Sequence, residues 1–283
     1  MRKFGIYEKA MPESLSISEK LASVKGAGYD SLELCFDESS QLLQRLDMPK
    51  PAITDIRRQA QNSGISLDSI SLSAHRRYSL GSSDAAMVHT GLELSKKAFE
   101  FACELGVQVI LIAGYDVFYE ESTPATFNRY LGNLQAITEI AASQGLILAL
   151  ENVDAAISSD IASCIRIIEN VKLPNLRLYL DVGNMNAMGV DYLLEIPKAK
   201  GLIEAVHIKD SKPGVSREVP LGTGTVNFAA VAALLDAQGC AAPCVIEMWH
   251  LPGTDYSSRI SKALKFVRQH FERASMDCGG SGI

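Results

Sequence analysis

The chain has 283 residues, 47% hydrophobic and 21% charged, a balance typical of a soluble protein that buries a large core. Its formal net charge of -6 argues against a nucleic-acid partner, since nucleic-acid-binding proteins usually present a basic field. No apolar run is long enough to cross a bilayer, and residues 1–6 lack the apolar core of a signal peptide. We therefore expect a cytoplasmic protein with no membrane partner.

The six cysteines give no sign of a metal or disulfide framework. They lack paired zinc-finger spacing with histidines, and most stand in apolar contexts typical of reduced core residues. Cys240 and Cys244 are four positions apart, but Pro243 and a predicted helix-to-strand turn separate them.

Strand-like and helix-like patterns alternate along the whole chain. Apolar runs predict strands at 4–8, 31–35, 65–72 and 107–112, and four further strands end at Glu151, Asp181, His207 and Glu247. Amphipathic patterns with proline starts and glycine stops predict the helices at 18–26, 51–63, 95–105, 126–143, 161–170, 192–200, 228–238 and 258–273.

Eight strand-then-helix units with no composition break predict an α/β fold, a single (β/α)8 TIM barrel over residues 1–275. The glycine-rich end, residues 276–283, is expected to be a disordered tail. An open doubly wound sheet would need a glycine-rich phosphate turn after the first strand, and residues 6–10 contain none.

Polar residues follow the predicted strands, where a barrel carries its functional face. The residues expected on this face are Glu8, Glu33, His75, Glu151, Asp181, His207 and Glu247. Any one carboxylate at a strand end is often only a cap for the next helix. Four consecutive strands that end in Glu, Asp, His and Glu are harder to explain as caps.

Three carboxylates at one barrel mouth would repel one another unless a cation lay between them. One imidazole and three carboxylates suit one divalent ion such as manganese, cobalt, magnesium or zinc. We therefore expect Glu151, Asp181, His207 and Glu247 to bind a metal. A metal between two carboxylates suits proton abstraction next to a sugar carbonyl, with Glu151 as one member of the acid–base pair.

Basic residues near the predicted mouth suit a phosphate group, although a solvated charged loop explains them about as well. They are Arg76 and Arg77, which follow His75, and Lys209, Lys212 and Arg217 after the His207 strand.

Six segments stand out together: GIYEKA (5–10), LSAHRR (72–77), AGYDV (113–117), DVGN (181–184), VHIKDSKPGV (206–215) and IEMW (246–249). With them the chain resembles the L-ribulose-5-phosphate 3-epimerases, also called L-xylulose-5-phosphate 3-epimerases, of the xylose isomerase-like TIM barrel superfamily. The resemblance runs from about Gly5 to Arg273.

The resemblance implies the same four metal ligands, and it implies that Glu151 and Glu247 are the proton-transferring pair. It also implies the substrate: L-xylulose 5-phosphate or L-ribulose 5-phosphate, epimerised at carbon 3 through an enediolate in pentose or ascorbate catabolism. Barrels of this superfamily commonly form homodimers. An aldose–ketose or hexulose-6-phosphate isomerase on the same metal site is the alternative within enzymes.

Asn184 departs from the wider superfamily. Enzymes that act on unphosphorylated ketoses usually have a histidine three residues after the metal aspartate, and here that position is Asn184. This favours the sugar-phosphate branch, in which basic residues near the mouth hold the phosphate. The candidates for substrate or phosphate contacts are His75, Arg76, Arg77, Lys209 and Lys212.

Two readings from other classes are weaker. Endonucleases for abasic DNA are relatives in this superfamily, but they carry more histidines and a basic surface, whereas this chain has five histidines and a net charge of -6. A non-catalytic sugar-phosphate-binding barrel would have no need for two opposed glutamates.

Overall fold

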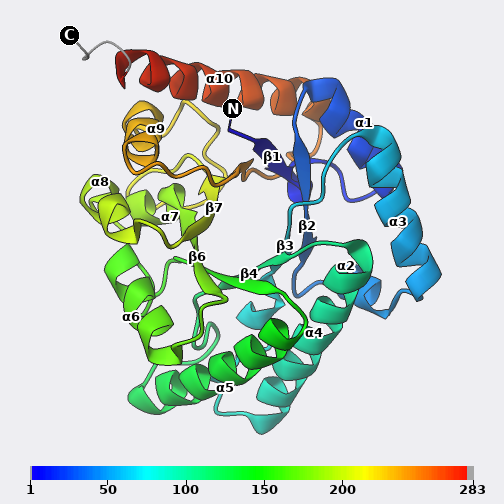
Figure 1. Cartoon of the computed structure of the whole chain (residues 1–283), viewed down its shortest axis with the longest axis vertical. Coiled ribbons are helices and arrows are strands. Elements are labelled where there is room, and N and C mark those ends of the chain that lie inside the picture. Colours follow the sequence, from blue (N-terminus) through cyan, green and yellow to red (C-terminus); the bar gives the residue numbers. More distant parts are fainter. Residues whose placement is uncertain (1, 279–283) are drawn as a thin grey trace.

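The computed structural model of the chain describes residues 2–278, with side chains to Glu272. Eight parallel strands pair in chain order and close into a barrel, as predicted (Figure 1). The strands are β1 Phe4–Tyr7, β2 Ser31–Phe36, β3 Ser69–Leu72, β4 Val109–Ala113, β5 Ile147–Glu151, β6 Leu176–Asp181, β7 Ile203–Ile208 and β8 Cys244–Ile246.

The strands read as continuous apolar runs because both of their faces are buried. Outward residues such as Leu148, Leu178 and Val206 belong to the main core between the barrel and the helices. Inward residues form separate small clusters, one of which contains Leu111, Ala149, Tyr179 and Ala205. Polar inward residues lie nearer the strand ends, and they build the site described below.

Helices surround the barrel (Figure 1). They are α1 Ile17–Ala27, α2 Ser40–Leu43, α3 Lys50–Ser63, α4 Ala85–Leu105, α5 Pro124–Ser143, α6 Ile161–Val171, α7 Val182–Ala187, α8 Tyr192–Glu195, α9 Phe228–Ala237 and α10 Tyr256–Cys278. Short 3-10 turns lie at η1 Glu8–Ala10, η2 Gln44–Asp47, η3 Ser73–Arg76 and η4 Ile196–Ala199. Helix starts follow ordinary capping chemistry. Ser16 forms a capping box with Glu19, for example.

Helix α4 is longer than predicted. It begins at Ala85, capped by Asp84, whereas the sequence pattern indicated a start at residue 95. The missed part contains Gly91, which weakens helix propensity. Gly91 is needed there because a Cβ atom would come within 2.3 Å of the Tyr78 carbonyl oxygen. The short helices α2 and α7 were not predicted either.

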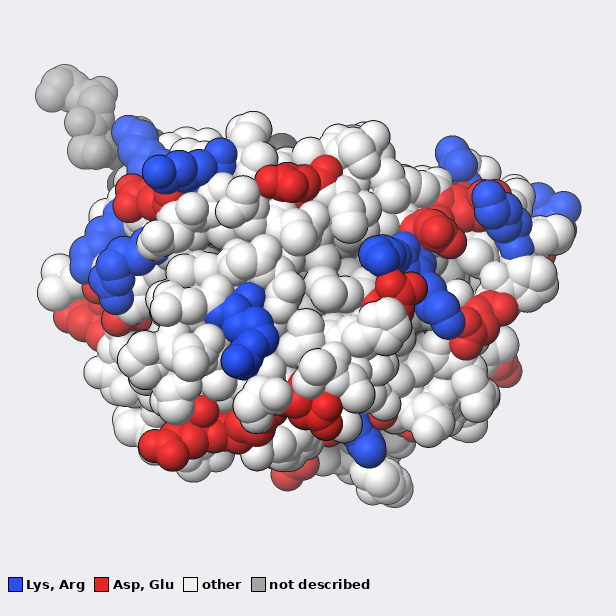
Figure 2. All heavy atoms as spheres, turned by 90° about the horizontal axis from the view of Figure 1, so that it is seen from below, with Lys and Arg blue, Asp and Glu red and all other residues white. Residues whose placement is uncertain are grey.

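Helix α10 runs to Cys278, and residues 279–283 of the expected tail lie outside the described residues. The division into a barrel of residues 1–275 and a tail stays a prediction. Among the described helices, none combines the length and the apolar character needed to span a membrane. On the face shown in Figure 2, basic and acidic side chains are interspersed among larger uncharged areas.

Candidate active site

The ends of strands β5 to β8 bring four potential metal ligands together. Atoms of Glu151, Asp181, His207 and Glu247 lie within 4.8 Å of one another. Strand register explains the meeting, because Asp181 on β6 pairs directly with His207 on β7. Glu247 follows β8, where its backbone N–H donates to Ile208 O and extends the ladder by one residue. The predicted convergence of these four side chains is confirmed.

Asp181 is both a helix cap and a member of this cluster. Its Oδ1 accepts a hydrogen bond from the Asn184 backbone N–H, which caps helix α7. Its Oδ2 faces His207 and Lys209. Asn152 holds the backbone of Asp181 in place, since its amide donates to Asp181 O and accepts from Asp181 N–H. This carboxylate can therefore cap helix α7 with one oxygen and remain available as a metal ligand through the other.

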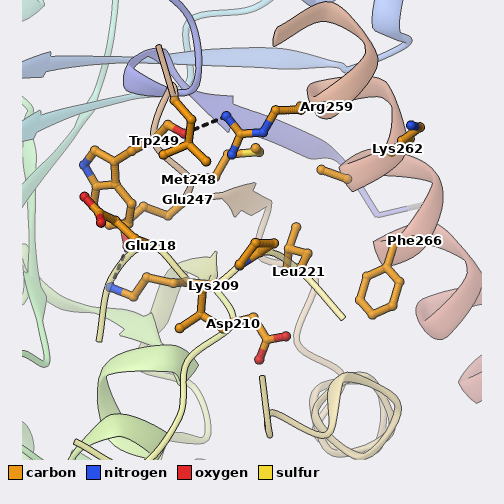
Figure 3. A pocket seen from close by; sticks show the side chains of 14 residues that line it. Lys209, Asp210, Glu218, Leu221, Glu247, Met248, Trp249, Arg259, Lys262 and Phe266 are labelled. Atoms are coloured by element: carbon orange, nitrogen blue, oxygen red, sulfur yellow. Dashed lines mark hydrogen bonds and ion pairs between the residues drawn. The ribbon is translucent and has the colours of Figure 1, made fainter. Parts of the chain in front are cut away.

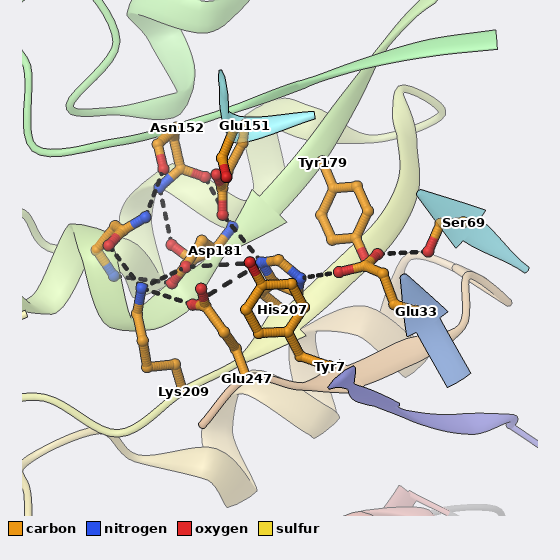
Figure 4. A network of polar contacts seen from close by, with 12 residues as sticks. Tyr7, Glu33, Ser69, Glu151, Asn152, Tyr179, Asp181, His207, Lys209 and Glu247 are labelled. Atoms are coloured by element: carbon orange, nitrogen blue, oxygen red, sulfur yellow. Dashed lines mark hydrogen bonds and ion pairs between the residues drawn. The ribbon is translucent and has the colours of Figure 1, made fainter. Parts of the chain in front are cut away.

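His207 is clamped on both ring nitrogens (Figure 4). Nδ1 lies 2.9 Å from Glu151 Oε1, on the cluster side. Nε2 lies 2.9 Å from Glu33 Oε1, on the opposite side of the ring. The Tyr179 ring packs against the imidazole with 4.5 Å between centroids. The ring orientation is set by the barrel interior rather than by a mobile loop.

Lys209 brings a buried positive charge to the cluster. Its Nζ lies 2.8 Å from Asp181 Oδ2 and 2.7 Å from Glu247 Oε2, and it donates to Asn184 Oδ1 at 2.8 Å (Figure 4). Asn184, the position of the superfamily departure, therefore contacts the Lys209 ammonium. Lys209 was predicted as a phosphate contact, and the structure places it among the carboxylates.

The cluster has strongly shifted acid–base properties. Burial raises the pKa of Asp181 to about 7, with Lys209 opposing this shift and Glu247 adding to it. Burial also disfavours charge on Glu247, but Lys209 and His207 outweigh it and lower the pKa of Glu247 to about 2. Burial opposes the imidazolium form of His207, yet Glu33 and Glu247 raise its pKa well above the usual value. Without a metal, the raised pKa of His207 favours the imidazolium form, and Asp181 takes up a proton as the pH falls through its pKa of about 7.

These residues fit a divalent metal. One imidazole nitrogen and three carboxylates form a donor set that manganese, cobalt and zinc accept. Asp181 Oδ2 and Glu247 Oε2 are buried and form ion pairs with Lys209, but among the described residues neither accepts a hydrogen bond of regular geometry. Buried carboxylate oxygens usually have such partners. A divalent cation held by these residues would add to the positive charge that Lys209 supplies.

The cluster forms the floor of a cavity at the barrel mouth, lined also by Lys9, Arg76, Tyr115 and Arg217. Of the basic residues that the sequence suggested for phosphate, Arg76, Lys209 and Arg217 line this cavity. Lys9 is a basic residue that the sequence analysis left out. It could have been found, because it lies within the GIYEKA segment that directly follows the first strand.

His75, Arg77 and Lys212 lie elsewhere. His75 is buried, with Nε2 2.9 Å from Ser95 Oγ on helix α4, and burial lowers its pKa to about 4. Arg77 is exposed, with its guanidinium over the Tyr78 ring. Lys212 is exposed in a turn where its backbone pairs with Val215. None of the three lines the described cavity.

Two strand-end glutamates do not face the mouth as expected. Glu8 lies in the 3-10 turn η1, where its carboxylate accepts from Lys20 and Arg45. Strand β2 continues to Phe36, so Glu33 lies inside the barrel beneath His207. The expectation was wrong because Glu8 belongs to a turn that directs it towards two basic side chains, and Glu33 lies within its strand rather than at the strand end.

A larger cavity of about 350 Å³ adjoins the site (Figure 3). It lies between the loop after β7 and helix α10, and its apolar wall includes Leu221, Met248 and Phe266. It shares Glu247, Lys209 and Trp249 with the cavity above the four-residue cluster. Arg259 donates to the Trp249 carbonyl and so fixes the shared wall.

The barrel and its strand-end cluster define a class of protein. Residues 21–270 match the family model of the xylose isomerase-like TIM barrel. Among solved structures, an L-ribulose 3-epimerase superposes with a TM-score of 0.83 at 23% identity, covering 99% of this chain and 97% of its own. A D-psicose 3-epimerase gives a TM-score of 0.79 at 19% identity, covering 95% of this chain and 99% of its own. At these identities the likeness shows the fold.

Curated relatives are closer in sequence. The L-ribulose-5-phosphate 3-epimerase UlaE of Escherichia coli O139:H28 is 36% identical over 272 residues, 96% of this chain and 96% of the relative. The protein of the same name from Shigella flexneri gives the same identity and coverage. The chain therefore belongs to the xylose isomerase-like TIM barrel family and, within it, to the L-ribulose-5-phosphate 3-epimerase family of isomerases.

Proposed function

We propose that the protein epimerises a phosphorylated L-ketopentose at carbon 3, interconverting L-xylulose 5-phosphate and L-ribulose 5-phosphate. The observation that carries the proposal is that Glu151 and Glu247 meet Asp181 and His207 in one cluster. The name of the 36% identical relatives supports the choice of substrate.

Glu151, Asp181, His207 and Glu247 would hold the metal. When bound, a divalent ion polarises the substrate carbonyl and stabilises negative charge on the enediolate. One glutamate removes the carbon 3 proton from one face of the sugar, and the other returns a proton to the opposite face. Two bases at a single carbon are what inversion needs, because one base would return the proton to the face it came from.

The rim of the cavity suits the phosphate ester. Lys9, Arg76 and Arg217 line it and supply positive charge above the cluster. The Arg76 guanidinium lies 5.0 Å from the Phe118 ring centroid and 5.9 Å from that of Tyr115, so aromatic contacts hold it in place. A phosphate bound by these residues would leave the carbon 3 end of the sugar facing the glutamates.

The decisive experiment incubates metal-reconstituted protein with L-xylulose 5-phosphate in deuterated water and follows the sugar by NMR. We expect L-ribulose 5-phosphate with deuterium at carbon 3, and no reaction after chelation. A new aldehyde signal would indicate the alternative, an aldose–ketose isomerase on the same site. Hexulose 6-phosphates tested in parallel address the length of the sugar. Retention of the carbon 3 proton with every metal would reject the proposal.

Two further expectations accompany this function. The proposed substrate implies a role in cytoplasmic pentose or ascorbate catabolism. A homodimer is expected because barrels of this superfamily commonly form dimers. Growth of a deletion strain on these sugars and light scattering of the purified protein test them.

A further inference from the structure

A second buried polar group lies beneath the metal-binding cluster. Glu33, on β2, is 1% exposed and lies in the barrel interior (Figure 4). Its Oε1 is 2.9 Å from His207 Nε2. Its Oε2 accepts hydrogen bonds from the Tyr179 hydroxyl, at 2.7 Å, and from the Ser69 hydroxyl. Strands β2, β3, β6 and β7 thus meet at one carboxylate.

A carboxylate inside a barrel costs free energy unless donors compensate for the lost water. Glu33 has three, and two of them are hydroxyl groups that donate to Oε2. An ionised carboxylate only accepts hydrogen bonds, so the imidazole nitrogen at Oε1 must carry hydrogen. Glu33 therefore selects the form of His207 in which Nε2 is protonated.

This selection has a consequence on the other side of the ring. If Nδ1 gives up its proton while Nε2 keeps its hydrogen for Glu33, the lone pair is on Nδ1. Nδ1 is the nitrogen that faces Glu151, Asp181 and Glu247, at 2.9, 3.9 and 3.9 Å. The carboxylate beneath the ring thus presents the correct nitrogen to a metal above it.

We propose that Glu33 is a positioning residue for the metal site, which it serves by setting the tautomer and orientation of His207 and by adding negative charge behind it. Tyr179 takes part twice, since it donates to Glu33 and packs against the imidazole ring. Ser69 completes the support. The inference rests on the proposed metal-dependent function.

The surroundings of Glu33 do not favour a purely structural role for its carboxylate. The neighbouring inward cluster is apolar, with Leu111, Ala149 and Ala205 around the Tyr179 ring. A carboxylate adds nothing to the packing of such a layer. Carboxylates that hold a metal-binding histidine typically contribute about 10–100-fold to metal affinity.

Three variants test the inference. Glu33→Gln keeps the shape of the side chain, removes its charge and allows an amide N–H to face Nε2. Ser69→Ala removes one support of Glu33 without touching His207. Asp116→Asn is the matched control, because Asp116 is also 1% exposed and accepts from two hydroxyls, those of Ser122 and Thr126, away from His207.

The measurements are affinity for manganese and cobalt by calorimetry, the visible spectrum of the cobalt-loaded protein, and nitrogen-15 NMR of the histidine rings in the zinc-loaded protein. We expect Glu33→Gln to weaken metal binding by about 10–100-fold and to change the cobalt spectrum and the His207 ring signals. Ser69→Ala should show a smaller loss, and Asp116→Asn should bind metal like the wild type.

Unchanged affinity, spectrum and ring signals in a folded Glu33→Gln protein would overturn the inference while leaving the proposed function intact. An equal loss of affinity in Asp116→Asn would also overturn it, because the effect would then come from any buried carboxylate. Failure of the wild type to bind metal would instead reject the proposed function.

Discussion

The ammonium group of Lys209 lies 2.7 Å from Oε2 of Glu247 and 2.8 Å from Oδ2 of Asp181. Both oxygens belong to residues that we propose as metal ligands. The side chains of Lys209 and Asp181 are almost fully buried, so water screens this interaction little. The lysine therefore stabilises a negatively charged cluster during the time in which no metal is bound.

Lys209→Met should destabilise the metal-free protein more than the metal-loaded protein. Loss of one partner from a buried ion pair costs about 3–5 kcal/mol, because the remaining charges stay buried. We expect a lower Tm without metal and a larger rise in Tm on addition of manganese than in the wild type. Lys198→Met is the control, since the Lys198 side chain is half-exposed and such an ion pair with Glu195 contributes about 0–1 kcal/mol. Equal metal-free stability of Lys209→Met and wild type would contradict this role.

Metal binding should weaken as the pH falls below about 7. The pKa of Asp181 is raised to about 7, so the metal-free protein binds a proton there at lower pH, and the metal must displace it. Affinity should fall by up to about tenfold per pH unit for each displaced proton. Calorimetry in buffers of different ionisation enthalpy counts the protons released. An affinity that stays constant between about pH 8 and about pH 6 would show that Asp181 is already ionised.

The sequence predicted the barrel and its four-residue cluster well because both depend on the strand pattern. Apolar runs that each end in Glu, Asp or His place those side chains at the same rim of a parallel barrel. Predicting the cluster required no distances, only the identity of the residue at the end of each strand. Glu151, Asp181, His207 and Glu247 were found in this way.

Other positions depended on the exact end of an element, which the sequence pattern leaves open. The turn η1 directs Glu8 towards Lys20, and η3 directs His75 towards helix α4. Glu33 lies within β2 rather than at its end, and its side chain contacts His207 inside the barrel. The contact between Lys209 and Asn184 joins the loop after β7 to helix α7 after β6, and no local pattern signals it.

Glu151→Gln and Glu247→Gln should each abolish exchange of the carbon 3 proton while preserving the fold. Loss of a positioned acid or base typically costs about 10²–10⁴-fold in rate, and here each variant also weakens the metal site. Deuterium incorporation followed by NMR gives the rate, and circular dichroism checks the fold. Glu204→Gln is the control, since Glu204 lies near the start of β7 and pairs with Arg177. Full exchange in either site variant would exclude the two-glutamate mechanism.

Arg76→Met should impair binding of the phosphorylated sugar, whereas Arg77→Met should not. Arg76 lines the cavity, and the neighbouring Arg77 is exposed outside it. A hydrogen bond to a charged group contributes about 1.5–3 kcal/mol, so we expect KM for L-xylulose 5-phosphate to rise about 10–100-fold with kcat less affected. Activity on unphosphorylated L-xylulose should be equal in both variants, because neither substitution changes a metal ligand or a residue proposed to contact the sugar hydroxyls. A similar rise in KM for both sugars would show that Arg76 shapes the cavity rather than binding phosphate.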